Sequence, residues 1–166
     1  IYPMLKLGRM TDYGVLVLHH LGRLRPARAS VETLAELTHL AQPTVRKVLH
    51  ALTRAELVTA KRGPTGGYAL ARPAERISLA EAITALQGPL ALTDCCDKEG
   101  SCEIQDRCDL AGRWHGINTL LVRVLERTSL KDLDAFGSRG QPLPPPLRMA
   151  LGTPSERLAA TSKVPE

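Results

Sequence analysis

Residues 57–71 constrain the fold more than any other part of this 166-residue chain. Two short segments rich in apolar residues, 57–61 and 68–71, flank the turn sequence Arg-Gly-Pro-Thr-Gly-Gly at 62–67. Segments of this kind on either side of a Gly- and Pro-rich turn predict a β-hairpin. Three segments with helical spacing precede the hairpin, so the first half of the chain is predicted to be mainly α-helical with one two-stranded sheet.

The three predicted helices are recognised by their apolar periodicity and by the residues at their ends. The first runs over 11–24, where apolar residues recur at helical spacing and Pro26 follows. The second begins after Ser30, whose hydroxyl can cap it. The third has Pro43 in its first turn, where the missing N–H costs nothing. The residues predicted to face inward are Leu34, Ala35 and Leu37 on the second helix and Val45, Val48, Leu49 and Leu52 on the third.

Three helices followed by a hairpin is the order of a winged helix-turn-helix. Only two or three residues separate the second helix from the third, and such a turn orients the third helix to enter a DNA major groove. The charge distribution agrees with DNA binding. Residues 1–76 contain twelve Lys/Arg and five Asp/Glu, a net charge of +7, whereas residues 77–166 contain ten and twelve, a net charge of −2. A basic half suits a polyanion such as DNA, although a solubilising surface can carry the same charge.

The residues predicted to contact DNA lie on the third helix and at the tip of the hairpin. Polar side chains of the helix can reach base edges or phosphates, and positive charge at the hairpin tip suits the minor groove or the backbone. Glycine in the hairpin allows a close approach to the sugar–phosphate wall. The candidate DNA-binding residues are Thr44, Arg46, Lys47, His50, Lys61, Arg62 and Gly66.

Two further helices are predicted after the hairpin. A capping box formed by Ser78 and Glu81 opens a short helix that ends near Gln87. A long helix follows over 110–127, where apolar residues recur at alternating steps of four and three. This seam predicts pairing of two copies of the chain, with packing on the chain's own domain as the alternative. The seam residues are Leu110, Trp114, Ile117, Leu121 and Val124.

These elements divide the chain into four predicted regions. A winged helix-turn-helix domain spans 4–87, a cysteine loop spans 88–110, and the dimerisation helix with a short C-terminal helix spans 111–136. Residues 137–166 are rich in Pro, Gly and Arg and are predicted to form a disordered tail. No stretch approaches the roughly 18 apolar residues of a membrane span, and no signal segment opens the chain. We therefore expect a cytoplasmic location, where thiols stay reduced.

Three evenly spaced cysteines, Cys96, Cys102 and Cys108, lie in the acidic loop. Thiolates suit iron–sulfur clusters, zinc or Cu(I). Structural zinc sites usually contain Cys-x-x-Cys pairs, which this chain lacks. Wide, even gaps instead favour a loop that wraps a larger group such as a cluster, with zinc and ligand-free thiols as alternatives. No nucleophile motif is present, so we expect no enzyme activity.

Three motifs together resemble the iron–sulfur-dependent winged-helix repressors typified by IscR and NsrR. They are Thr-Asp-Tyr-Gly-Val at 11–15, Leu-Val at 57–58 with Arg-Gly-Pro-Thr-Gly-Gly-Tyr-Ala-Leu at 62–70, and the three-cysteine loop. The resemblance spans about residues 4–136 and is greatest to regulators of the Suf cluster-assembly operon. It implies a homodimeric repressor that binds an inverted-repeat operator, senses cluster status and controls cluster-assembly genes. The alternatives are a nitric-oxide-responsive repressor of the same family and a zinc or cluster carrier.

The resemblance also implies the ligands of a [2Fe–2S] or [4Fe–4S] cluster. IscR-like members carry a histidine ligand three residues after the last cysteine, where this chain has Ala111. NsrR-like members use an aspartate in the first helix, supplied by the other subunit, and Asp12 occupies the matching position. The candidate ligands are therefore Cys96, Cys102, Cys108 and Asp12, with Cys95, His115 or a ligand from outside the protein as alternatives for the fourth position.

Overall fold

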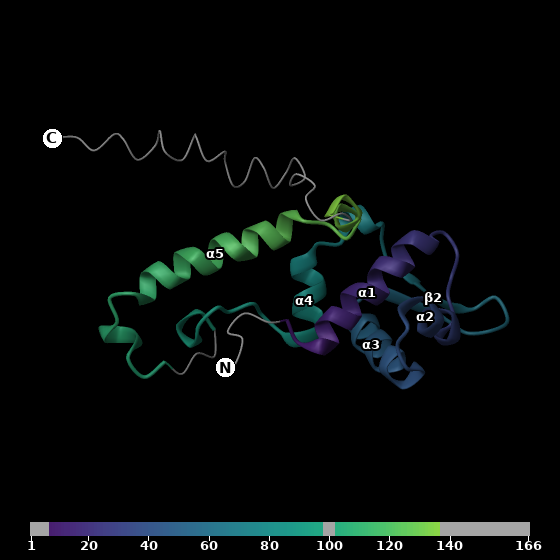
Figure 1. The fold of residues 1–166 in the computed structure, drawn as a ribbon, viewed down its shortest axis with the longest axis horizontal. Helices are drawn as coiled ribbons and strands as arrows, with labels where there is room; N and C mark the ends of the chain where they lie inside the picture. Colours follow the sequence, from purple (N-terminus) through teal and green to yellow (C-terminus); the bar gives the residue numbers. More distant parts are fainter. Residues whose placement is uncertain (1–6, 98–101, 137–166) are drawn as a thin grey trace.

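The computed structural model describes residues 7–97 and 102–136, which form a winged helix-turn-helix and a long helical arm (Figure 1). The predicted mainly α fold with a two-stranded wing is confirmed. The predicted tail at 137–166 lies outside the described residues. In chain order, the elements are α1 Arg9–Leu24, α2 Val31–Thr38, α3 Gln42–Arg54, β1 Val58–Lys61, β2 Gly67–Leu70, η1 Ala74–Arg76, α4 Leu79–Gln87, η2 Asp94–Cys96, η3 Gln105–Arg107, α5 Ala111–Arg127 and η4 Lys131–Phe136.

The turn between α2 and α3 is defined by the residues that end one helix and begin the next. Ser30 Oγ accepts a hydrogen bond from Thr33 N–H at 3.1 Å and caps α2, as predicted. His39 then adopts a left-handed conformation, with φ of 55°, and ends the helix. Pro43 lies in the first turn of α3. This short connection fixes the direction of α3 relative to α2.

The core of the domain is formed by aliphatic side chains from α1, α2, α3 and the wing. The inward face predicted for α3 is confirmed, because all four of its residues are buried. The prediction for Leu37 is wrong, since its side chain is 40% exposed. The buried positions of α2 are Val31, Leu34 and Thr38, spaced by three and four residues, which rotates Leu37 onto the flank of the helix.

The wing is an antiparallel pair in which Val58 lies opposite Leu70 and Lys61 lies opposite Gly67. The segment before α2 adds a bridge, because Tyr68 N–H donates to Ala29 O at 2.8 Å and Ala29 N–H donates to Tyr68 O at 2.9 Å. Gly67 has a φ of 122°, and a Cβ there would lie 2.7 Å from Ala29 O. Only glycine fits this position without strain.

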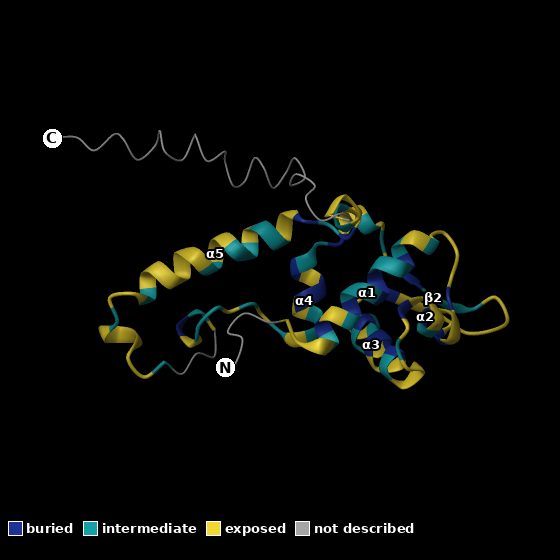
Figure 2. Ribbon diagram, viewed as in Figure 1, coloured by how far each residue is buried: buried dark blue, intermediate teal, exposed yellow. Residues whose placement is uncertain are grey.

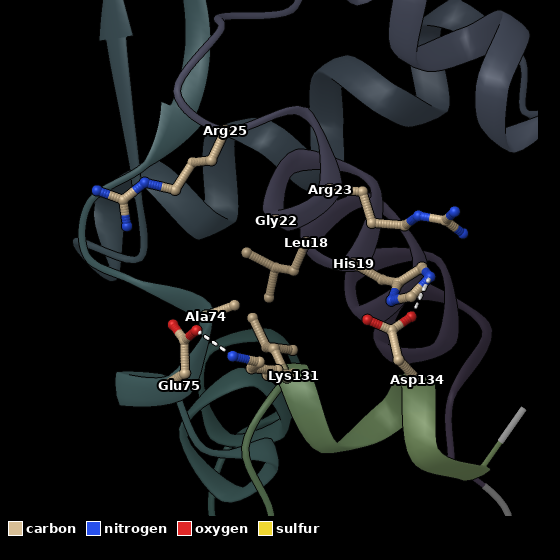
Figure 3. A pocket seen from close by; sticks show the side chains of 10 residues that line it. Leu18, His19, Gly22, Arg23, Arg25, Ala74, Glu75, Lys131 and Asp134 are labelled. Atoms are coloured by element: carbon tan, nitrogen blue, oxygen red, sulfur yellow. Dashed lines mark hydrogen bonds and ion pairs between the residues drawn. The ribbon is translucent and has the colours of Figure 1, made fainter.

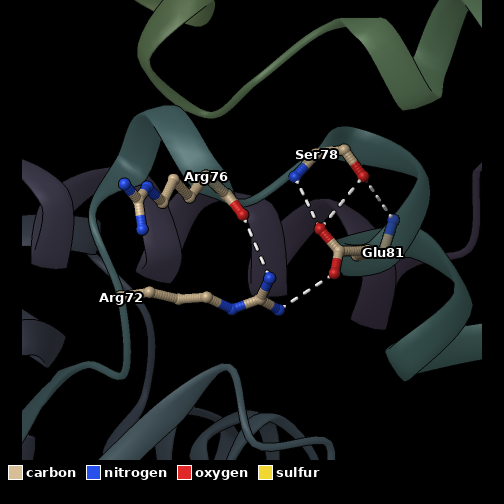
Figure 4. Close-up of polar contacts among 4 residues, drawn as sticks. All are labelled: Arg72, Arg76, Ser78 and Glu81. Carbon is tan, nitrogen blue, oxygen red and sulfur yellow. Dashed lines mark hydrogen bonds and ion pairs between the residues drawn. The ribbon is translucent and has the colours of Figure 1, made fainter.

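The capping box predicted at the start of α4 is confirmed (Figure 4). Ser78 N–H donates to Glu81 Oε2 at 2.9 Å, and Glu81 N–H donates to Ser78 Oγ at 3.2 Å. Arg72 Nη2 donates to Glu81 Oε1 at 2.9 Å. Partial burial raises the pKa of Glu81, but these hydrogen bonds outweigh it and hold the pKa below its ordinary value. The first turn of α4 is thus fixed to the residues that follow the wing.

The chain returns to the winged-helix domain after α5. Thr128 O accepts a hydrogen bond from Leu79 N–H at 2.8 Å, and Leu130 N–H donates to Ile77 O at 2.9 Å. The Leu130 side chain is 2% exposed and belongs to the same apolar core as α1 and α3. Residues 111–136 therefore complete the core of the DNA-binding domain as well as forming the arm.

One ion pair and one contact between a histidine and a carboxylate flank this return, at a cavity between α1, η1 and η4 (Figure 3). Lys131 Nζ donates to Glu75 Oε1 at 2.9 Å, and His19 Nε2 lies 3.8 Å from Asp134 Oδ1. The hydrogen bond with Glu75 raises the pKa of Lys131. The exposed Lys131–Glu75 pair contributes little to stability, so the buried Leu130 side chain is the main anchor. Within the described ranges, no helix combines the length and apolarity needed to cross a membrane.

Candidate functional site

The third helix presents the predicted DNA-binding side chains on its outer face. Arg46, Lys47 and His50 are exposed, and Thr44 is half-buried. Arg46 Nη2 lies 3.6 Å from Glu32 Oε1 of α2. Both side chains of this pair are well exposed, so the interaction is weak and water or a phosphate can replace it. The guanidinium group is therefore available to a polyanion.

The tip of the wing carries Lys61 and Arg62, both exposed, beside a tightly folded turn. A Cβ at Gly66 would lie 2.3 Å from Lys61 O, so only glycine allows the turn to close. At the base of the wing, Arg28 Nη1 donates to Gly67 O at 3.1 Å and to Thr59 O at 3.3 Å. The contact of Arg28 with the wing cannot be predicted from the sequence, because it depends on the bridge between residues 29 and 68.

Asn118 of α5 forms hydrogen bonds with the backbone of the cysteine loop. Asn118 Oδ1 accepts a hydrogen bond from Leu92 N–H at 3.0 Å, and Asn118 Nδ2 donates to Leu90 O at 3.3 Å. The loop leaves α4 and runs outward, and α5 brings the chain back (Figure 1). The cysteines of η2 consequently lie beside the first half of α5.

Among the residues that the structure describes, one group of side chains could hold a metal ion: Cys95, Cys96 and His115. Their ligand atoms all lie within 4.8 Å of one another. Cys95 is buried, Cys96 is half-buried and His115 is exposed. The Thr93 hydroxyl donates to Cys96 Sγ at 3.3 Å and lies 3.1 Å from Cys95 Sγ. Two thiols and an imidazole are a donor set that suits zinc and iron–sulfur centres.

The other predicted ligands lie elsewhere in the described structure. Cys102 and Cys108 are half-buried residues on either side of η3, and both carry free thiols. Neither belongs to the group formed by Cys95, Cys96 and His115. Asp12 is exposed in the first turn of α1 and is also outside the group. The structure therefore brings Cys96, a predicted ligand, together with Cys95 and His115, which were predicted only as alternatives for the fourth ligand.

A cavity of about 510 Å³ opens next to this group. It lies between α4, the cysteine loop and α5, and Cys96 forms part of its wall. Ala80, Thr84, Asn118, Val122 and Glu126 are among the other lining residues. The space beside the Cys96 side chain is consequently large enough for a group bigger than a single ion.

An apolar face of α5 is open to solvent. None of the residues of this helix, all of which the structure describes, is buried (Figure 2). The side chains of Leu110, Trp114 and Ile117 are 49%, 38% and 51% exposed, whereas Leu121 and Val124 are half-buried. An exposed apolar surface of this kind is a candidate site for contact with another protein chain.

Comparisons with known proteins agree on one family. A sequence model of the Rrf2 family, described as "Iron-dependent Transcriptional regulator", matches residues 7–135. The HTH-type transcriptional regulator NsrR of Oceanobacillus iheyensis is 37% identical over 134 residues, which cover 78% of this chain and 89% of that protein.

Solved structures show the same fold. The structure of CymR, the global cysteine regulator of B. subtilis, has a TM-score of 0.66 and 25% identity and covers 80% of this chain and 98% of that one. T. potens IscR has a TM-score of 0.64 and 24% identity, and the match covers 86% of this chain and 96% of that one. The protein is therefore a member of the Rrf2 family of transcriptional regulators, and not an enzyme.

Proposed function

We propose that this protein is a homodimeric transcription repressor whose operator binding depends on an iron–sulfur cluster held by the 88–110 loop. The observation that carries the proposal is that one chain of this family contains both a basic face on α3 and a cysteine loop that α5 connects to the same domain. The basic face of α3 suits DNA, and α5 leads from the cysteine loop to Leu130, which is buried in the core on which α3 packs.

The donor set of the loop fits a cluster. Cys96, Cys102 and Cys108 would hold it, because soft thiolates are its preferred ligands and all three thiols are free. Of the three, only Cys96 lines the cavity of about 510 Å³, so binding would require the loop to bring Cys102 and Cys108 toward it. The cluster would supply iron that reacts with small diatomic molecules. Asp12 of the partner subunit is the proposed fourth ligand, with Cys95 as the competing one.

The names of the relatives bear on the signal. Three relatives from three species, 30–37% identical to this chain, are called NsrR, which favours the nitric-oxide-responsive alternative over control of Suf genes. We therefore propose nitric oxide as the signal, acting through loss of the cluster. Control of cluster-assembly genes stays a prediction from the sequence. Control of cluster-assembly genes would be favoured if the protein stayed on its operators after nitric oxide treatment but left them when cluster supply fell.

The proposed coupling follows α5 from one end to the other. Its first half lies beside the cysteine loop through Asn118, and its C-terminal end leads directly to Thr128 and Leu130. These residues are hydrogen-bonded to the start of α4 and buried in the core. A loop ordered by ligation would therefore bias the position of α5 and, through the dimer, the separation of the two α3 helices.

Replacing Arg46 or Lys47 with Ala tests the DNA-binding half of this proposal. Loss of a base-edge contact should weaken operator binding by about 1–3 kcal/mol and relax specificity at one position, whereas loss of a phosphate contact should mainly reduce the salt dependence. Fluorescence anisotropy with operator and scrambled DNA at several salt concentrations measures both. Arg127→Ala, at the exposed end of α5, removes the same charge away from α3 and should bind normally. Unchanged binding in both α3 variants would rule out α3 as the recognition helix.

Replacing Ile117 with Glu tests the dimer. Ile117 lies in the middle of the exposed seam, and a charge buried there in a two-fold interface should yield monomers. Sedimentation velocity measures the change. Leu37→Glu is the matched control, because Leu37 is a 40% exposed apolar residue of α2 outside the seam and should leave the dimer intact. A dimer that survives Ile117→Glu would contradict the proposed interface.

A further inference from the structure

We propose that the cluster-free protein binds a single zinc ion through Cys95, Cys96 and His115, and that this ion competes with the cluster for Cys96. The first half of the proposal stands on the arrangement of these three residues alone. The second half rests on the proposed function, because it requires Cys96 to serve as a cluster ligand.

The arrangement of the donor atoms fits one small ion. In a tetrahedral zinc site with Zn–S bonds of about 2.3 Å, two sulfurs lie roughly 3.8 Å apart. The ligand atoms of the group all lie within 4.8 Å of one another, so a small contraction brings them to bonding distance. Two thiolates and one imidazole leave the fourth position for water or another ligand, as in open zinc sites.

The group is held in place by hydrogen bonds from its surroundings. His115 Nδ1 lies 2.8 Å from Ala111 O, so this nitrogen carries the proton and Nε2 keeps its lone pair for a metal. Asn118 ties the backbone at Leu92 to the same helix at 3.0 Å, which keeps the cysteines close to His115. The hydroxyl of Thr93 lies 3.1 and 3.3 Å from the two sulfurs. Metal ligands commonly depend on supporting contacts of this kind.

Burial favours a cation over free thiolates. Cys95 is 7% exposed, so an unpaired thiolate there would lose much of its hydration. A doubly charged ion balances two thiolates, and binding releases the two thiol protons without any change of oxidation state. Zinc suits mixed thiolate and imidazole ligands, whereas magnesium and calcium prefer oxygen.

Sharing of Cys96 has a consequence for cluster assembly. Cys102 and Cys108 lie outside the zinc group, so the zinc-bound chain retains two of its three proposed cluster cysteines while the third is occupied. Assembly of the cluster would then require release of zinc. After the cluster is lost, bound zinc would keep the thiols of Cys95 and Cys96 from reacting.

The experiment uses the full chain, reduced and freed of cluster under anaerobic conditions. Titration with Co²⁺ should give thiolate-to-metal absorption bands that saturate at one ion per chain and disappear when Zn²⁺ is added. Cys95→Ala and His115→Ala should each weaken binding more than about tenfold, since even supporting residues contribute about 10–100-fold. The double variant Cys102→Ala/Cys108→Ala is the matched control and should bind Co²⁺ as the wild type does. Full affinity in either single variant, or loss of binding in the double variant, would overturn the site.

A second measurement tests the competition and separates it from the proposed function. Cluster assembly, followed by iron and acid-labile sulfide, should be slowed by one equivalent of Zn²⁺ in the wild type but not in His115→Ala. Equal assembly rates with and without zinc in the wild type would exclude the competition. If no cluster forms in the absence of zinc, the proposed function fails while the Co²⁺ result still decides whether the zinc site exists.

Discussion

Replacing Cys102 or Cys108 with Ala is expected to abolish the cluster and the cluster-dependent part of operator binding. Each substitution removes one of three proposed thiolate ligands, and the two thiolates that remain cannot enclose the group. Both cysteines lie beside the short η3 turn and away from the apolar core, so the fold should survive. Iron and acid-labile sulfide per chain measure the first effect, and anaerobic operator binding measures the second.

Gln105→Ala provides the control for this prediction. Gln105 is an exposed residue of η3 between the two cysteines, so its loss alters the same turn without removing a ligand. Its iron and sulfide content should equal that of the wild type. Full cluster content in both cysteine variants would show that the loop binds its cofactor through other residues.

The visible spectrum of the cluster and anaerobic operator binding together identify the fourth ligand. Asp12→Ala should change the visible spectrum of the cluster and its effect on DNA binding while leaving the dimer intact. Cys95→Ala should leave both nearly unchanged, because Cys95 is not a ligand in the cluster site proposed. The reverse pattern, with Cys95 essential and Asp12 silent, would place the whole site within one subunit's loop and exclude the route through the partner's α1.

Leu130→Ala is expected to destabilise the protein by about 2–5 kcal/mol. The Leu130 side chain is 2% exposed and packs in the core shared by α1 and α3, so truncation leaves a cavity. Denaturant unfolding with cluster-free protein measures the loss. Leu37→Ala, at a 40% exposed site, should change stability by less than about 0.5 kcal/mol. Equal stability of Leu130→Ala and the wild type would mean that the segment after α5 does not anchor the arm.

Much of the fold could be predicted because it is encoded locally. The cap at Ser30, the proline of α3 and the capping box at Ser78 each act within four residues, and all three occur as predicted. Leu37 was misplaced because an eight-residue helix buries only a narrow stripe. The anchoring of Leu130 was missed because its backbone partner, Ile77, lies far away in the sequence.

The candidate metal group was only partly predictable for a similar reason. Cysteine thiols indicate metal binding from the sequence alone. The proximity of Cys96 and His115, however, depends on the loop folding back along α5. That contact is made by Asn118, 26 residues after Leu92, and no periodicity signals it. The hydrogen bonds of Arg28 could not be predicted for the same reason, because they are made with a wing that begins 30 residues later.

The most direct test compares operator binding by one preparation of the full chain with its cluster intact, after nitric oxide treatment, and after removal of the cluster by a chelator. The cluster-loaded protein should bind the operator roughly 5–150-fold more tightly than the other two forms, which is the usual range of allosteric coupling. Binding to scrambled DNA should be the same in all three. Equal operator affinity with and without the cluster would contradict the proposal that cluster occupancy controls the position of the two α3 helices.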